Sequence, residues 1–146
     1  MSHAFIVRPA RWNEDEDAIA RVRRAVFIEE QGVPEALEWE SADADCAWFV
    51  AAEPAGEVVG IGRLTPSGRI GRMAVMPCWR GRGVGGALLA QVIQAARERG
   101  QTSVELSAQT RAMAFYLRHG FSVLGDEYMD AGIPHRAMKL QLGVSP

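Results

Sequence analysis

The sequence predicts an α/β fold in which one mixed sheet carries helices on both faces. Segments with strand character dominate the first half of the chain, and strands alternate with helices in the second half. This order of elements is typical of a mixed sheet that helices cover from both sides. The chain has 146 residues, with no internal repeat and no low-complexity linker, so we expect residues 1–146 to form a single domain.

The first half of the chain contains four short apolar segments that read as strands, at residues 5–8, 46–53, 57–64 and 69–76. Between the first two, apolar residues recur near the helical period and predict one helix face: Ala18, Ile19, Val22, Val26 and Phe27. Asn13 or Asp15 can cap this helix. Residues 29–45 read as irregular, because they are rich in carboxylates and are broken by Gly32 and Pro34.

The second half of the chain begins with a glycine-rich loop and continues as alternating helices and strands. A helix follows the loop and stops at Gly100, and a shorter helix stops at Gly120. Strands are expected at residues 104–107, 121–124 and 136–142. One side of the shorter helix carries Ala112, Phe115, Tyr116 and His119.

Composition excludes several classes of partner. The formal net charge is −2 and no basic run occurs, so we expect no nucleic-acid binding. The longest apolar run, residues 46–52, is too short to span a membrane, and residues 1–9 do not read as a signal peptide. The two cysteines, Cys46 and Cys78, suit free thiols in a reducing cytoplasm, and neither has a partner at metal-ligand spacing. We therefore expect a cytoplasmic protein without a metal site.

The glycine-rich loop, residues 80–86 (Arg-Gly-Arg-Gly-Val-Gly-Gly), lies between a strand and a helix. Glycines let backbone N–H groups point into one concavity, and the helix N-terminus adds unpaired N–H groups and a positive dipole end. Arg80 and Arg82 can add charge-assisted hydrogen bonds. This arrangement predicts a binding site for a diphosphate.

Two alternatives for that diphosphate follow from known loop patterns. A P-loop is excluded because the loop contains no lysine. Gly81, Gly83 and Gly86 do satisfy the dinucleotide pattern, with Glu105 near the distance of a ribose-binding acid. However, too little sequence follows the loop for a doubly wound domain, and Glu105 falls inside its strand. A dinucleotide-binding protein stays the least favoured interpretation.

A family resemblance favours coenzyme A. Arg80-x-x-Gly83-x-Gly85, which follows the strand 72–75, resembles the acetyl-CoA signature of the GNAT superfamily of N-acetyltransferases. Ala112-x-x-Phe115-Tyr116-x-x-x-Gly120-Phe121 resembles the helix and strand that follow in that family. The resemblance covers nearly the whole chain. It implies a mostly antiparallel mixed sheet of six or seven strands, splayed in the middle, with acetyl-CoA as co-substrate.

More narrowly, four segments are similar to the ElaA-like branch: 26–34 (Val-Phe-x-x-Glu-Gln-Gly-Val-Pro), 38–43, 108–110 and 132–135. The chain departs from the superfamily at Gln109-Thr110, where Asn often stands. It also has Trp48 where that branch more usually shows His.

The resemblance also implies roles for individual residues. The strand Met73-Ala74-Val75 would offer a free backbone N–H to the oxyanion, and Tyr116 would protonate the departing thiolate. The cofactor-binding residues it implies are Met73, Ala74, Val75, Arg80, Gly81, Arg82, Gly83, Val84, Gly85, Gly86, Gln109, Ala112 and Phe115.

The sequence defines less well the part of the site that would bind the amine. Glu105 and His135 are candidates for the base that deprotonates the amine. The acidic stretch 29–45 is a candidate lining for a pocket that takes a cationic substrate, through Glu30, Gln31, Glu40 and Asp43. We therefore expect an N-acetyltransferase acting on a small-molecule or peptide amine. A non-catalytic acyl-CoA sensor is the main alternative, and exposed sheet edges also allow a homodimer.

Overall fold

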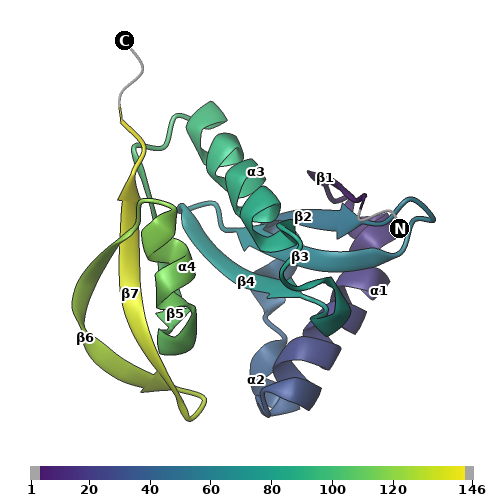
Figure 1. The fold of residues 1–146 in the computed structure, drawn as a ribbon, viewed down its shortest axis with the longest axis horizontal. Coiled ribbons are helices and arrows are strands. Elements are labelled where there is room, and N and C mark those ends of the chain that lie inside the picture. Colours follow the sequence, from purple (N-terminus) through teal and green to yellow (C-terminus); the bar gives the residue numbers. More distant parts are fainter. Residues whose placement is uncertain (1–3, 144–146) are drawn as a thin grey trace.

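One seven-stranded sheet organises the molecule (Figure 1), and the computed structural model describes residues 4–143. The sheet order is β1-β2-β3-β4-β5-β7-β6, and every neighbouring pair is antiparallel except β4 and β5. The strands are β1 (Ile6–Pro9), β2 (Ala47–Ala52), β3 (Val58–Leu64), β4 (Arg69–Val75), β5 (Ser103–Gln109), β6 (Ser122–Asp130) and β7 (Ile133–Gln141). The predicted mixed, mostly antiparallel sheet is confirmed. Residues 1–9 were considered as a signal peptide, and of these, residues 1–3 lie outside the described residues.

The helices are α1 (Trp12–Arg23), α2 (Glu35–Glu38), α3 (Val84–Glu98) and α4 (Met113–Arg118). A π-helical segment, Arg24–Glu30, continues α1, and short 3₁₀ turns cover Ser41–Asp45, Pro77–Trp79 and Thr110–Ala112. Asn13 lies inside α1 and does not cap it. The Asp15 carboxylate accepts a hydrogen bond from the Arg11 backbone N–H at 2.8 Å, so Asp15 does stabilise the helix start.

Two expectations from the sequence need correction. The stretch 29–45 is less irregular than its composition indicates, because it contains α2 and the turn Ser41–Asp45. The closing hairpin is longer than residues 121–124 and 136–142, since β6 extends to Asp130 and β7 begins at Ile133. Most of β6 is exposed, so its residues lack the alternation of apolar and polar side chains that marks a strand.

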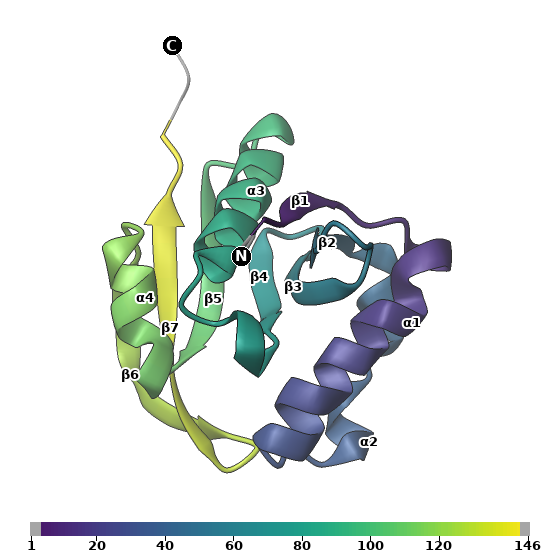
Figure 2. The same cartoon turned by 45° about the vertical axis from the view of Figure 1, so that its right-hand side comes forward.

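The sheet has an apolar cluster on each face. In β2, Phe49 and Ala51 join the cluster that contains α3, while Trp48 and Val50 join the cluster that contains α1. This alternation follows from the two-residue period of a strand. In Figure 2, strands β1 to β3 lie between α3 and α1. Helices therefore cover both faces, as predicted.

The sheet opens between β4 and β5. These parallel strands pair only at Arg69 with Glu105 and at Ile70 with Leu106, and they diverge beyond that point (Figure 1). From Gly71 to Val75, the β4 edge that faces β5 has no partner strand among the described residues. Backbone N–H groups on that edge are free to bind a ligand.

A β-bulge in β4 lies at the start of this opening. Ile61 pairs with Ala74 and Arg63 with Gly71, so Arg72 and Met73 together lie opposite one residue of β3. Arg72 has a φ of 49°, in the left-handed region that a non-glycine residue rarely adopts. The bulge bends β4 where it leaves β5.

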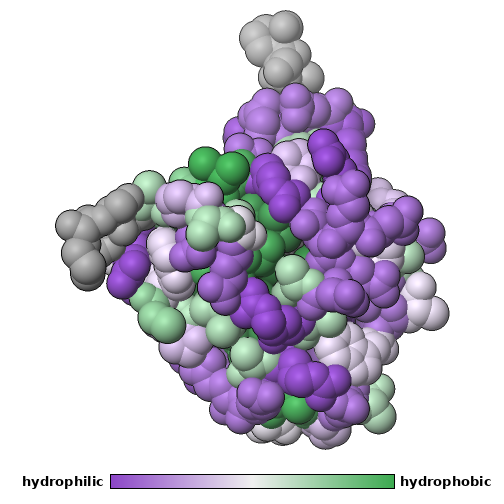
Figure 3. All heavy atoms as spheres, turned by 90° about the vertical axis from the view of Figure 1, so that its right-hand side faces the viewer, coloured by the Kyte–Doolittle hydropathy of each residue, from purple (hydrophilic) through white to green (hydrophobic). Residues whose placement is uncertain are grey.

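The surface on the side of α1 is mainly hydrophilic, with apolar residues gathered in a smaller area among the polar ones (Figure 3). Within residues 4–143, none of the helices combines the length and the apolar character that crossing a bilayer requires.

Candidate active site

A cavity of about 860 Å³ occupies the region where β4 and β5 separate. The glycine-rich loop, the start of α3, α4 and the end of the π-helical segment complete its walls. Most residues that the sequence singled out line this cavity: Glu30, Gln31, Met73, Ala74, Val75, Arg80, Gly81, Gly83, Val84, Gly85, Gly86, Gln109, Ala112, Phe115, Tyr116 and His135. Arg82, Glu40, Asp43 and Glu105 are not among the residues that line it.

The glycine-rich loop has the backbone that an anion site needs. Gly81 and Gly83 adopt φ values of 77° and 84°, and a Cβ at either position would meet no atom within 4 Å. Backbone conformation, and not space, therefore favours glycine at these two positions. Gly83 precedes α3, whose N-terminus has no side-chain cap. The first N–H groups of this 15-residue helix are thus available to a diphosphate, which fits the cradle.

The two arginines of the loop already have partners. Arg80 donates from both terminal nitrogens to the Glu30 carboxylate, at 2.7 and 2.6 Å, and from Nε to the Val75 carbonyl at 3.0 Å. The hydrogen bonds from Arg80 lower the pKa of Glu30 below its usual value. The Arg82 guanidinium lies over the Trp79 ring, 4.8 Å from its centroid. Neither guanidinium is free in this arrangement.

Tyr116 lies on α4 with its ring buried against two aromatic neighbours. The centroids of the Phe115 and Phe121 rings are 5.1 and 5.7 Å away. Its hydroxyl group forms no hydrogen bond with another described residue, and the side chain lines the cavity. Burial raises the pKa of Tyr116 to about 12, so the phenol carries its proton at neutral pH.

Polar contacts span the opening between the two halves of the sheet. Gln109, at the end of β5, donates to Oε1 of Gln31 at 2.6 Å, and Arg111 donates to Oε1 of Gln109 at 2.9 Å. Gln31 directly follows the π-helical segment. These contacts tie the end of β5 to the helix on the other side of the opening.

His135, on β7, lines the same cavity from the side of β5. Its Nδ1 lies 2.7 Å from the Ile133 carbonyl, so the neutral ring donates from Nδ1 and leaves Nε2 as an acceptor. The ring stacks on Tyr128, with centroids 6.0 Å apart, and the Tyr128 hydroxyl forms a hydrogen bond with Ser107.

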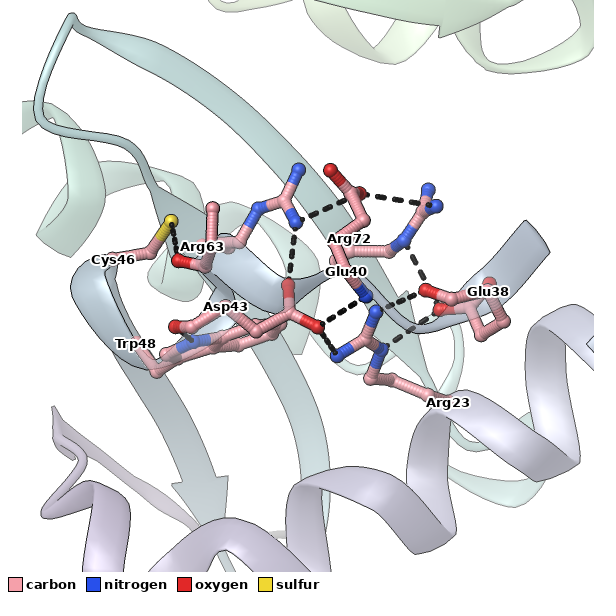
Figure 4. Close-up of polar contacts among 9 residues, drawn as sticks. Arg23, Glu38, Glu40, Asp43, Cys46, Trp48, Arg63 and Arg72 are labelled. Atoms are coloured by element: carbon pink, nitrogen blue, oxygen red, sulfur yellow. Dashed lines mark hydrogen bonds and ion pairs between the residues drawn. The ribbon is translucent and has the colours of Figure 1, made fainter. Parts of the chain in front are cut away.

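Glu40 and Asp43 lie instead in a cluster of arginines and carboxylates (Figure 4). Asp43 accepts a hydrogen bond from Arg23 at 2.8 Å and one from Arg63 at 2.8 Å, and Arg63 also donates to Glu40 at 3.1 Å. Arg23 further binds the fully buried Glu38 at 2.8 Å. These carboxylates neutralise buried arginines and do not face the cavity.

Glu105 also lies away from the cavity, although it shares a face of β5 with Ser107, which lines it. Glu105 is in the paired part of the sheet, opposite Arg69 on β4 and Lys139 on β7. The opening begins only beyond this position, so the strand geometry keeps Glu105 out of the site.

Several cavity residues were missed in the sequence, and three of them show why. Arg72 lines the cavity because the bulge turns β4, Arg111 because the turn Thr110–Ala112 follows β5, and Trp79 because the turn Pro77–Trp79 precedes the loop. The bulge and the turns carry no local sequence signal that would identify these positions. The described residues contain no group of three or more His, Cys, Asp or Glu able to hold a metal ion.

A sheet that opens beside a glycine-rich loop, with a protonated tyrosine in the opening, is an arrangement suited to acyl transfer. Comparison with known proteins agrees. The model of the acetyltransferase (GNAT) domain matches residues 13–142. YjcF of Bacillus subtilis, an uncharacterized N-acetyltransferase, is 38% identical over 122 residues, covering 80% of this chain and 86% of YjcF. This chain therefore belongs to the GNAT family of acetyltransferases, whose general reaction is acetyl transfer from acetyl-CoA.

Solved structures show the same fold. An acyl-CoA N-acyltransferase from Pseudomonas aeruginosa superposes with a TM-score of 0.82 at 27% identity, covering 94% of this chain and 99% of that one. ElaA from Escherichia coli superposes with a TM-score of 0.80 at 23% identity, covering 94% and 100%. The resemblance to the GNAT superfamily is confirmed, and ElaA is among the structural neighbours.

Proposed function

We propose that the protein transfers the acetyl group of acetyl-CoA to a primary amine of a small molecule or peptide, by direct attack in a ternary complex. One observation carries this proposal: a single cavity joins the glycine-rich loop, the unpaired edge of β4 and the side chain of Tyr116. The loop would hold the diphosphate, and the open sheet would admit the pantetheine arm as an additional strand. The thioester would then lie beside Tyr116.

The chain would stabilise the two charges that develop during transfer. Attack on the thioester carbon places negative charge on the carbonyl oxygen, and a free N–H group on the edge formed by Met73, Ala74 and Val75 would donate to it. Tyr116 would donate its proton to the sulfur as the carbon–sulfur bond breaks. A phenol with a pKa of about 12 is a weak acid next to a thiol near 8.5, so donation occurs only as charge builds on sulfur.

The amine must lose its proton before it attacks. We assign this step to His135, because it lines the cavity and its Nδ1 contact leaves Nε2 able to accept a proton. The same contact holds the ring in one orientation. Glu105, the other candidate, lies outside the cavity.

A thiol-release assay with acetyl-CoA and a panel of polyamines, amino acids, aminoglycosides and peptides tests this function. We expect at least one amine to be acetylated, and Tyr116→Phe to lower kcat by about 100-fold while CoA affinity changes little. Tyr128→Phe is the matched control, since it removes the chain's other phenol. Equal kcat for wild type and Tyr116→Phe would remove Tyr116 from the mechanism.

The same panel of amines distinguishes an enzyme from a non-catalytic acyl-CoA sensor. That protein would bind CoA in calorimetry and release no thiol with any amine. Absence of CoA binding, or tighter binding of NADH than of CoA, would contradict both interpretations.

A further inference from the structure

The carboxylate of Glu30 has a contact that the proposed reaction does not explain. Glu30 is the only carboxylate among the described residues that line the cavity, and it is held by both terminal nitrogens of Arg80. Arg80 belongs to the loop that would bind the diphosphate. The same guanidinium thus lies between an anion of the protein and the expected anion of the ligand.

The charge of the acceptor makes this contact important. A primary amine is a cation at neutral pH, and a buried or half-buried cation needs an anionic partner. The other charged groups that line the cavity are arginines or can be cationic: Arg72, Arg80, Arg111, Arg118, His119 and His135. A free ammonium group would therefore be repelled by this wall unless Glu30 faced it.

We propose that Glu30 binds the ammonium group of the acceptor, and that it becomes available when the diphosphate of the co-substrate takes Arg80 from it. This inference rests on the proposed function. The Glu30 carboxylate then binds two partners in turn: Arg80 in the free protein, and the amine in the ternary complex.

The energetics favour such an exchange. The side chains of Arg80 and Glu30 are 43% and 37% exposed, and exposed pairs of this kind contribute little to stability. A diphosphate offers more negative charge and the same two-pronged geometry to a guanidinium. It also lies at the N-terminus of α3, which adds its own attraction. The carboxylate is therefore the weaker competitor for Arg80.

The backbone around Glu30 does not need to move. Gln31 is held across the opening by Gln109 at 2.6 Å. The backbone N–H groups of Gln31 and Gly32 donate to the carbonyls of Val26 and Ile28, each at 3.1 Å. Only the Glu30 side chain has to rotate, which fast side-chain motion permits.

Two variants of the full-length protein test the exchange. Glu30→Gln removes the competing charge, so by calorimetry it should bind CoA about two- to five-fold more tightly than wild type. Pantetheine lacks the diphosphate and should bind both proteins alike. Glu29→Gln is the matched control, because Glu29 is exposed and does not line the cavity. Unchanged or weaker CoA binding by Glu30→Gln would mean that Glu30 only orients Arg80, and would overturn the exchange.

The acceptor role is measured separately, with the amine that gives the highest rate in the panel. Glu30→Gln should raise its KM by about ten-fold or more, since a hydrogen bond to a charged group is lost, while Glu29→Gln should leave KM unchanged. A KM that stays at the wild-type value overturns this role. If wild type acetylates no amine, the acceptor role fails together with the proposed function, and CoA titration still decides whether Glu30 and the diphosphate compete.

Discussion

Two groups of ion pairs between arginines and carboxylates lie in opposite environments in this molecule, one buried and one exposed. The Arg23 cluster is buried: the side chain of Arg23 is 2% exposed, and those of its partners Glu38 and Asp43 are 0% and 7% exposed. The Arg80–Glu30 pair lies at the surface of the cavity. Breaking a buried pair leaves an unpaired charge without water, while breaking an exposed pair lets water replace the partner. The first group is suited to hold the fold, and the second to exchange partners.

The buried cluster also contains a carboxylate that the arginines do not fully satisfy. Burial raises the pKa of Glu38, although the hydrogen bond from Arg23 opposes this effect, and its Oε1 has no hydrogen-bond partner. Arg72 approaches the other oxygen at 3.0 Å. The cluster thus connects α1 to the bulge of β4, where the sheet opens.

The largest effect is expected from loss of Arg23. Arg23→Ala strands Glu38 and Asp43 without their main donor, so the free energy of unfolding should fall by about 3–5 kcal/mol. Arg24→Ala, at the next position, removes an exposed pair with Glu35 and a contact with the Trp39 ring, and should cost less than about 1 kcal/mol. Urea denaturation measures both variants. Similar losses would contradict the distinction between buried and exposed pairs.

The bulge predicts a second, smaller difference. Arg72→Gly and Arg72→Ala both lose the ion pair with Glu38, but only glycine adopts a φ of 49° without strain. Arg72→Gly should therefore be more stable than Arg72→Ala by about 1 kcal/mol. The difference in unfolding free energy between the two variants measures this strain, reduced by the entropy that glycine adds to the unfolded chain. A more stable alanine variant would mean that the bulge relaxes when the arginine is removed.

Acid should weaken the buried cluster. Burial opposes ionisation of Asp43, but the hydrogen bonds from Arg23, the Glu40 N–H group and Arg63 outweigh it and lower the pKa of Asp43. Its contribution to stability is complete above the unfolded value of about 3.9, and is lost as pH falls through the lowered folded value. Wild type should lose more unfolding free energy than Asp43→Asn when pH falls from about 6 to about 3. Parallel pH curves for the two proteins would contradict this role for Asp43.

The smallest effect on stability is expected at the exposed pair. Glu30→Gln should change the free energy of unfolding by less than about 1 kcal/mol, although it changes ligand binding. A larger loss in the same urea experiment would mean that the Arg80–Glu30 pair stabilises the fold as the Arg23 cluster does, and would remove the contrast between the two groups.

The sequence predicted best what is encoded within a few consecutive residues. The glycine-rich loop, the face of α3 and the position of Tyr116 on a short helix each follow from local spacing, and the structure places them around one cavity. The positions of Glu40 and Asp43 could not be predicted in this way. Their arginine partners lie on α1 and β3, up to 23 residues away in the chain, so an acidic run in the sequence looked like a binding surface.

The opening of the sheet was implied by family resemblance and not by residue patterns. A bulge of one residue in β4 and a parallel pairing of two residues with β5 produce it, and both depend on how β4 pairs with other strands. Glu30 was predicted to line the pocket for the amine, but its contact with Arg80 was hidden, because it joins residues 50 apart. Contacts over such distances depend on tertiary packing, which local pattern does not report.

The π-helical segment Arg24–Glu30 separates the two groups along one continuous helix. A π turn holds one residue more than an α turn, and each residue of an α-helix advances the side chain by about 100°. If the same residues were wound as α-helix, Glu30, seven residues after Arg23, would lie on nearly the same face as Arg23. The wider π turns instead rotate Glu30 away from that face, to a position where its carboxylate contacts Arg80. One extra residue in the helix thus sets which face of the helix the Glu30 side chain occupies.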